Sequence, residues 1–345
     1  MSFLSLFHNI FGEGRNINNV AIPNIFGTGR DIYWYGIIIA IGVVVAFIIA
    51  QRDVKRRKMP SDSAVDMVIW AMIPAIIGAR LYYVIFDPSG RIDTFAEIIN
   101  ISGGGLAIYG GVIGGAIGLF LYSIVKKHKI TTLFDIAAPC LAIGQAFGRW
   151  GNFMNQEAFG NPVTDPAMQW FPYAVYFNNP KDAMPGWFQA TFFYESFWCL
   201  LICIFIIIYR KRQRFSGELA LWYFALYGLE RTFVELLRQD QLKIGGEAGV
   251  PVSSLLSAVL VVVSVTLLCI GYFYVKKGKI APATPGSIYY IEPEDENGAE
   301  AQKNTNDTKI SVLEKLRSVI NNIKPKQDTN NKDNNTADED EEDDI

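Results

Sequence analysis

Charged side chains inside long apolar stretches are the feature of this sequence that most directly suggests chemistry. They are Arg80, Asp135, Arg149, Glu195, Glu230, Arg231 and Glu235. A single ion at the centre of a lipid bilayer costs roughly 2.5 to 3.5 kcal/mol, even on lenient insertion scales. We therefore expect these side chains to pair with one another or to face water in a polar site.

One of these stretches places three polar side chains at helical spacing. Tyr227, Arg231 and Glu235 follow one another at intervals of four residues, and Arg238 would lie about one turn further. In a helix this spacing stacks a phenol, a guanidinium and a carboxylate on one face. Two interpretations stay open: an ion pair that only holds helices together, or one wall of a functional site.

The most specific stretch covers residues 148–160, where glycines and polar side chains follow an apolar segment. Its polar and glycine members are Gly148, Arg149, Gly151, Asn152, Asn155, Gln156, Glu157 and Gly160. Arg149 would lie where hydrocarbon meets the lipid head groups, so its planar guanidinium could bind a phosphate through two hydrogen bonds. A snorkelling arginine followed by a polar turn is the simpler alternative.

Glycines are concentrated between residues 103 and 118. Two stripes recur at intervals of four residues: Gly110, Gly114 and Gly118, and Gly111 with Gly115. Such stripes are typical of closely packed membrane helices. The preceding run, which includes Gly104 and Gly105, has backbone without side chains, to which a phosphate or a head group could approach. A flexible entry loop explains that run equally well.

Composition decides the class of protein. The chain has 345 residues, of which 50% are hydrophobic and 19% charged, and its mean hydropathy is +0.20. Apolar segments long enough to cross a bilayer core of ~30 Å as helices are residues 32–50, 67–86, 106–125, 130–150, 188–209, 219–237 and 250–275. We therefore predict an all-α integral membrane protein with seven transmembrane helices.

The basic residues predict how these helices are oriented. Lysines and arginines gather after the first, third, fifth and seventh segments, and few lie in the intervening loops. Cytoplasmic loops carry this excess, so we expect the N-terminus outside and the C-terminus in the cytoplasm. Residues 1–279 would form the membrane domain. Residues 280–345 form an acidic tail that we expect to be mostly disordered, with a short amphipathic helix over 309–323.

Several kinds of chemistry have little support. The four cysteines lie in apolar stretches, and only two histidines occur, so we expect no disulfide framework, no metal site and no cofactor. The basic residues form short clusters between apolar segments, which argues against nucleic-acid binding. From the residues alone, three classes stay open: an enzyme acting on a lipid, a secondary transporter with charges inside the membrane, and a non-catalytic receptor for a lipid or signal peptide.

The combination of motifs resembles the bacterial prolipoprotein diacylglyceryl transferases. The resemblance is carried by the order of Gly148-Arg149, Asn152-Phe153, Asn155, Glu157 and Gly160. Supporting motifs along residues 15–275 are Tyr33-Trp34-Tyr35-Gly36, Gly78-Ala79-Arg80, Ile108-Tyr109-Gly110-Gly111, Tyr194-Glu195-Ser196, and Tyr227-Gly228 followed by Arg231, Glu235 and Arg238.

The resemblance implies an enzyme of the bacterial cytoplasmic membrane. It would transfer the diacylglyceryl group of phosphatidylglycerol to the lipobox cysteine thiol of a prolipoprotein signal peptide, forming a thioether and releasing glycerol phosphate. The implied catalytic residues are Arg149, Asn152, Glu157, Arg231, Glu235 and Tyr109. The implied substrate-binding residues are Arg149, Tyr35, Asn155, Gly160, Tyr227, Gly104, Gly105 and Arg80.

Three positions depart from other members of the family: Gln189 and Phe192, before Tyr194, and Tyr109, which bears on the mechanism. Tyr109 stands where one branch of the family has a histidine before the paired glycines. A tyrosine, with an ordinary pKa near ~10, is a poor general base at neutral pH, so the histidine mechanism cannot be carried over. Tyr109 could donate a hydrogen bond instead, and the thiol proton could pass to Glu157, to Glu235, or leave under the local positive field.

Overall fold

The computed structural model describes residues 11–13, 17–24, 27, 29–86, 98–99, 105–181, 183–237, 243–244 and 250–279. The chain divides into two units, Met1–Ile291 and Glu292–Ile345, and the description below concerns the first. Gly104, Arg238 and the whole of 280–345, with the amphipathic helix expected over 309–323, lie outside the described residues.

Long helices dominate the described chain, at nearly the predicted positions. They are α2 (Trp34–Arg56), α3 (Ser63–Ile85), α5 (Ile108–Val125), α6 (Ile130–Met154), α7 (Thr191–Tyr209), α8 (Glu218–Glu235) and α9 (Val252–Lys276). Short 3-10 helices are η2 (Pro166–Met168) and η3 (Arg210–Arg212). Within the described residues, six helices are long and apolar enough to cross a membrane: α2, α3, α5, α6, α7 continued by η3, and α9. The span predicted over residues 219–237, which corresponds to α8, is not among them.

The expectation of an all-α fold missed three small antiparallel sheets in the described chain. They pair β1 (Val20–Ile22) with β2 (Ile32–Tyr33), β3 (Ala174–Phe177) with β4 (Gly186–Gln189), and β5 (Lys243–Ile244) with β6 (Val250–Pro251). In the second sheet Val175 lies opposite Phe188. The apolar run predicted to span from residue 188 therefore begins as a strand, and helix α7 starts only at Thr191.

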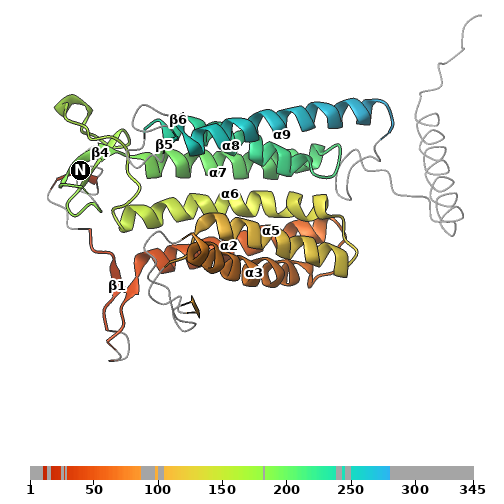
Figure 1. Ribbon diagram of the computed structural model, residues 1–345, viewed down its shortest axis with the longest axis horizontal. Coiled ribbons are helices and arrows are strands. Elements are labelled where there is room, and N and C mark those ends of the chain that lie inside the picture. Colours follow the sequence, from red (N-terminus) through yellow and green to blue (C-terminus); the bar gives the residue numbers. More distant parts are fainter. Residues whose placement is uncertain are drawn as a thin grey trace, which may run out of the picture. The chain divides into compact units, whose positions relative to one another are not determined.

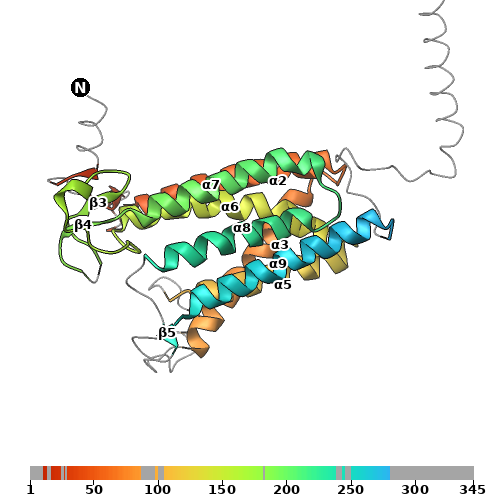
Figure 2. The same cartoon turned by 90° about the horizontal axis from the view of Figure 1, so that it is seen from above.

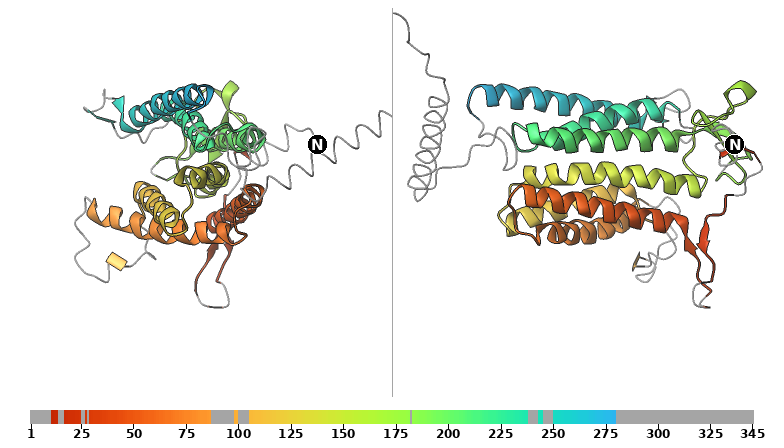
Figure 3. Two further views of the ribbon diagram at one scale, coloured as in Figure 1. Left: turned by 90° about the vertical axis from the view of Figure 1, so that its right-hand side faces the viewer. Right: turned by 180° about the vertical axis from the view of Figure 1, so that it is seen from behind.

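Helix α6 occupies the centre of the helical part. It packs against α2, α7 and α8, while α3 packs on α5 and α8 on α9. Figure 1 shows these helices running side by side, and the end view in Figure 3 shows α6 between the α3–α5 pair and the α8–α9 pair. Strands β3 and β4 lie beside the end of α6 and the start of α7 (Figure 2).

The predicted glycine stripe does pack two helices together. A Cβ on any of the three glycines of the first stripe would collide with a backbone carbonyl oxygen of α3. The pairs are Gly110 with Gly78, Gly114 with Pro74, and Gly118 with Trp70. These close approaches need backbone without side chains. The second stripe is looser, because Cβ atoms at Gly111 and Gly115 would meet atoms of α3 only at 3.7 Å.

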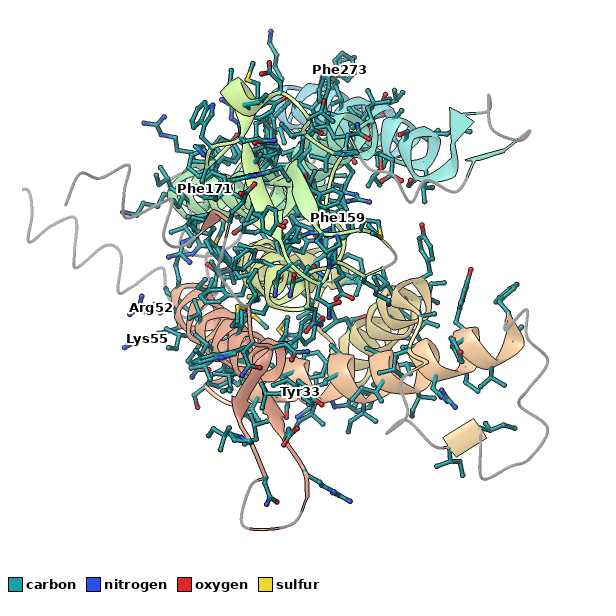
Figure 4. All side chains as sticks on the ribbon, turned by 90° about the vertical axis from the view of Figure 1, so that its left-hand side faces the viewer. Tyr33, Arg52, Lys55, Phe159, Phe171 and Phe273 are labelled. Carbon is teal, nitrogen blue, oxygen red and sulfur yellow. The ribbon has the colours of Figure 1, made fainter. Side chains whose placement is uncertain are left out.

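An aromatic cluster fixes the loop between α6 and α7. Phe153 stacks on Phe192 with ring centroids 4.6 Å apart, and Phe159 contacts Phe188 at 4.4 Å. Figure 4 labels Phe159 and Phe171 within this end of the molecule, close to the β3–β4 hairpin. Buried aromatic area of this kind is a major source of packing energy, so the residues after α6 are held in a defined position.

Candidate functional site

Two arginines and two glutamates from three helices form one ion network. The carboxylate oxygen Oε2 of Glu195, on α7, binds two arginines. Nη2 of Arg149, on α6, lies 2.5 Å from it, and Nη1 of Arg231, on α8, lies 2.9 Å from it. Nη2 of Arg231 donates to Oε2 of Glu235 at 2.9 Å. The ion pair predicted within α8 is therefore confirmed, and it continues across to α6 through Glu195.

The network is buried, and its two arginines are engaged to different extents. Glu195 is 1% exposed and Glu235 is 4% exposed. The side chains of Arg149 and Arg231 are 19% and 14% exposed. Among the described residues, Arg149 uses a single N–H group on the protein, while Arg231 gives one to each of two carboxylates. Arg149 thus has donors left for an anionic ligand.

A direct link between α6 and α7 fixes the spacing of Arg149 and Glu195. The indole N–H of Trp150 donates to Oγ of Ser196 at 3.0 Å, and Ser196 donates to the backbone carbonyl of Ala146 at 2.9 Å. Trp150 and Ser196 are the sequence neighbours of Arg149 and Glu195. The Arg149–Glu195 ion pair therefore lies next to a hydrogen bond that already links α6 to α7.

Glu157 belongs to a second polar cluster, at the end of α6. Its Oε1 accepts the side-chain amides of Asn152 at 3.0 Å and Asn155 at 3.3 Å. Gln156 and Ala158, on either side of Glu157, both have positive φ, at 52° and 55°. This conformation is rare for residues with a side chain, and it turns the carboxylate back onto the last turn of the helix.

Tyr35 lies beside this cluster, at the first turn of α2. Its ring fills the space in front of Gly151, where a Cβ would lie 2.6 Å from the ring carbon Cδ2. Glu157 and Arg149 are the charged side chains that act on its phenol. The phenol of Tyr35 is therefore within electrostatic reach of both polar clusters.

Gly160 has a packing reason of its own. A Cβ at this position would lie 2.8 Å from both Cβ of Gln189 and Cγ2 of Thr191. The backbone of Gly160 donates to the carbonyl of Gln189 at 3.1 Å. The protein itself fills the space that we expected a substrate to use.

Tyr227 lies on the α8 face that carries the network. Its ring stacks on Tyr223 with centroids 5.7 Å apart, and the Tyr223 hydroxyl donates to Oε1 of Gln145 at 2.9 Å. Arg231 and Arg149 are the charged side chains with the largest electrostatic effect on the Tyr227 hydroxyl. The predicted alignment of Tyr227, Arg231 and Glu235 on one face is thus consistent with the contacts of α8.

Arg80, Gly105 and Tyr109 form a separate group, where α3 meets the start of α5. Arg80 donates to the backbone carbonyls of Ile98 at 2.9 Å and Gly105 at 2.8 Å. Tyr109 is 54% exposed, with its ring 6.2 Å from that of Tyr82. In the described part of the chain, no hydrogen bond joins Tyr109 to Arg149, Glu157 or Glu235.

Two residues of this region were not among the predicted site residues. Glu195 joins the two arginines, and Glu230 is 5% exposed, with neither oxygen hydrogen-bonded to a described residue. The signal for both was a carboxylate inside an apolar segment. The expectation that each such charge finds a partner is wrong for Glu230. Asp135 has partners, but they lie at the other end of the bundle, at the start of α8.

Nothing in the described residues gathers three or more histidine, cysteine, aspartate or glutamate side chains in a way that could hold a metal ion. The donor set consists instead of guanidinium, amide, phenol and carboxylate groups. Such groups bind an anion and its polar substituents through charge-assisted hydrogen bonds. The site is suited to a phosphate ester.

Comparison with known proteins decides the family. The family model described as prolipoprotein diacylglyceryl transferase matches residues 23–270. The chain belongs to the prolipoprotein diacylglyceryl transferase family. Relatives named phosphatidylglycerol–prolipoprotein diacylglyceryl transferase include one from Clostridium botulinum, 38% identical over 258 residues, which are 74% of this chain and 98% of the relative. One from Listeria welshimeri is 40% identical over 273 residues, which are 79% of this chain and 93% of the relative.

A third relative with the same name, from Finegoldia magna, is 39% identical over 240 residues, or 69% of this chain and 91% of its own. The matched region contains both polar clusters and every long helix up to residue 270. Together with the apolar helices, membership of this family of membrane enzymes makes the chain a multi-pass membrane protein.

Proposed function

We propose that this protein transfers the diacylglyceryl group of phosphatidylglycerol to the thiol of the lipobox cysteine in a prolipoprotein signal peptide. The sulfur forms a bond to the terminal glycerol carbon of the diacylglyceryl group while that carbon's bond to the phosphate oxygen breaks. The phosphate keeps the electron pair and leaves as glycerol phosphate. Family membership supports the reaction, and the chemistry of the two clusters supports the roles below.

The observation that carries the proposal is the convergence of Arg149 and Arg231 on Glu195. Negative charge on the phosphate grows as it leaves, and fixed cations in a site shielded from water stabilise such charge most effectively. Arg149 binds the phosphate with its remaining N–H groups. Arg231, held by Glu195 and Glu235, adds positive charge and fixes the direction in which Arg149 points.

The thiol must lose a proton to react well, because only a few per cent of an ordinary thiol is ionised at pH 7. Glu235 is buried and paired with Arg231. Glu157 is less buried, and its two amide partners in the described chain both bind Oε1. Glu157 is therefore the carboxylate better placed to take the proton through Oε2. Asn152 and Asn155 orient it, and Tyr35 and Tyr227 flank the lipid head group.

Gly105 and Arg80 fit a supporting role at the mouth of the site. A side chain at Gly105 would collide with Arg80 and with the ring of Tyr83. Gly105 also has a φ of +76°, a conformation that glycine adopts at little cost. Arg80 therefore ties Gly105, in the loop before α5, to α3, with Gly104 next to Gly105 in sequence and Tyr109 in the first turn of α5.

We infer that α8 also spans the membrane, which brings the number of spans to seven. The hydroxyls of Tyr209, at the end of α7, and Tyr272, near the end of α9, lie 3.1 Å apart, so these two helices run in the same direction. The chain must recross the membrane between them. Helix α8 joins the two ends and packs closely on α9, where Gly228 faces Ser257 and Val261.

The orientation follows from the basic residues at one end. Arg210 at the end of α7 contacts Asp53 near the end of α2 at 3.2 Å, so the clusters after these helices lie together. By the positive-inside rule this end is cytoplasmic. The N-terminus and the Glu195 network then lie toward the outside of a bacterial plasma membrane.

The proposal is tested with purified protein, phosphatidylglycerol and a signal peptide that contains one cysteine. Mass spectrometry should show a diacylglyceryl adduct on sulfur, with one glycerol phosphate released per adduct. Phosphatidylcholine replaces phosphatidylglycerol in the control. Binding of both substrates without product would indicate a receptor, and lipid-independent solute uptake by proteoliposomes would indicate a transporter; either result contradicts the proposal.

A further inference from the structure

A second buried group of charges lies at the end of the bundle opposite to the Glu195 network. Three arginines converge there on the carboxylate of Asp53, which is 1% exposed. Asp53 accepts hydrogen bonds from Nε of Arg56 at 2.7 Å, from Nε of Arg57 at 2.8 Å and from Nη1 of Arg210 at 3.2 Å. On α6 this end is separated from Arg149 by the interval between Asp135 and Arg149, about 21 Å of helix.

The other carboxylate nearby is already engaged. Asp135 is fully buried and accepts the side-chain amide of Gln213 at 2.5 Å and the backbone N–H groups of Gly217 at 2.7 Å, Leu219 at 2.9 Å and Ala220 at 3.1 Å. It neutralises the positive end of the α8 dipole. Asp135 is therefore committed to the start of α8 and offers no further oxygen to Arg56 or Arg210 in the described chain.

The three arginines therefore carry three positive charges against the single carboxylate of Asp53 that they share. Nη2 of Arg56 and Nε of Arg210 are buried, and neither donates a hydrogen bond to a described residue. Buried guanidinium N–H groups without acceptors are costly. The side chains of Arg56 and Arg210 as a whole keep 15% and 17% of their exposure through atoms other than these two nitrogens, so a ligand at the surface reaches the nitrogens once the side chains turn outward.

The position and charge of this group specify the ligand. Basic pockets between helices at the cytoplasmic side of a membrane bind anionic lipid head groups, and a guanidinium matches the oxygens of a phosphate. Arg52, one turn before Arg56 on α2, and Lys55, its immediate neighbour, point away from the helices in Figure 4 and add only exposed charge.

We propose that Arg56 of α2 and Arg210 of η3 form a binding site for the phosphodiester of an anionic phospholipid in the inner leaflet, separate from the Glu195 site. With the two side chains turned toward the surface, the phosphate accepts hydrogen bonds from the unpartnered N–H groups and neutralises excess charge around Asp53. The lipid thereby links the end of α2 to the end of α7.

Thermal unfolding of the full-length protein in a neutral detergent tests this inference. Arg149→Gln serves as the background, because it weakens phosphate binding at the Glu195 site. Short-chain phosphatidylglycerol should raise the unfolding temperature of this variant, and phosphatidylcholine should not. Adding Arg56→Gln and Arg210→Gln should abolish the shift, whereas adding Arg52→Gln, an exposed arginine of the same helix, should preserve it.

A second variant keeps the test decisive if the double substitution does not fold. Arg210→Lys retains the charge but lacks Nε, so the lipid concentration for half the shift should rise about tenfold. The inference is overturned if Arg149→Gln shows no shift, or if the shift and its half-saturating concentration are unchanged by Arg210→Lys. An equal shift with inorganic phosphate alone would also overturn it, because the source would then be free phosphate.

Discussion

Arg149 and Arg231 donate to the same oxygen atom, Oε2 of Glu195, from two different helices. Two cations are thereby held close together, near the end of α6 and the start of α7, although their repulsion would otherwise separate them. Only Arg149 keeps most of its donors unused by the described protein. In the proposed mechanism this asymmetry gives the two arginines different tasks: Arg149 binds the phosphate, and Arg231 positions Arg149 through Glu195.

The shared carboxylate should dominate the stability of this region. Glu195→Gln leaves two partly buried arginines without their common counter-ion, and breaking a buried ion pair costs about 3 kcal/mol. Glu230→Gln changes a neighbouring buried carboxyl that has no hydrogen-bond partner in the described chain, so the unfolding free energy should change by less than ~1 kcal/mol. Thermal unfolding of both variants checks the prediction. Equal losses would contradict the assigned role of Glu195.

The proton acceptor can be identified by comparing two conservative substitutions. Glu157→Gln preserves the shape but removes the base, so kcat should fall by about 100-fold or more with a smaller change in KM. Tyr109→Phe removes a hydroxyl that is not bonded to either polar cluster, so kcat should stay within about tenfold. Initial rates of glycerol phosphate release measure both. A larger loss for Tyr109→Phe than for Glu157→Gln would reverse the assignment.

The glycine stripes permit a prediction with a control on the same helix. Gly114→Ala pushes a methyl group into the backbone of α3, which cannot move aside easily, so we expect a loss of about 2 kcal/mol. Gly115→Ala meets α3 at 3.7 Å and should be neutral or slightly stabilising, since alanine favours helix. Chemical unfolding in detergent distinguishes them. Equal stability of the two variants would contradict the close packing of α3 and α5.

Hydropathy and helical spacing predicted most of the fold, because apolar runs of membrane length leave the chain few alternatives to a helix. Helices α5 and α6 begin within two residues of the predicted starts at 106 and 130. The same signal failed at residue 188, where Phe188 pairs in a strand. Hydrophobicity alone cannot distinguish a buried strand from the start of a membrane helix.

The candidate site was predicted in part. Spacing correctly joined Arg231 to Glu235, four residues apart on one helix. The bond between Arg149 and Glu195 spans 46 residues, and nothing local to either residue specifies which helices meet. Gly160 shows the opposite difficulty: a glycine that leaves room for a ligand and one that leaves room for Gln189 are identical in sequence.

The central claim is that Arg149 holds the phosphate whose bond to carbon breaks. The most direct measurement is the rate of thioether formation by Arg149→Gln, with Arg30→Gln, an exposed arginine outside both clusters, as the matched control. We predict a fall of at least about 100-fold for Arg149→Gln in protein with unchanged helical content, and a rate within about twofold of wild type for Arg30→Gln. Wild-type rates from a folded Arg149→Gln protein would contradict the account.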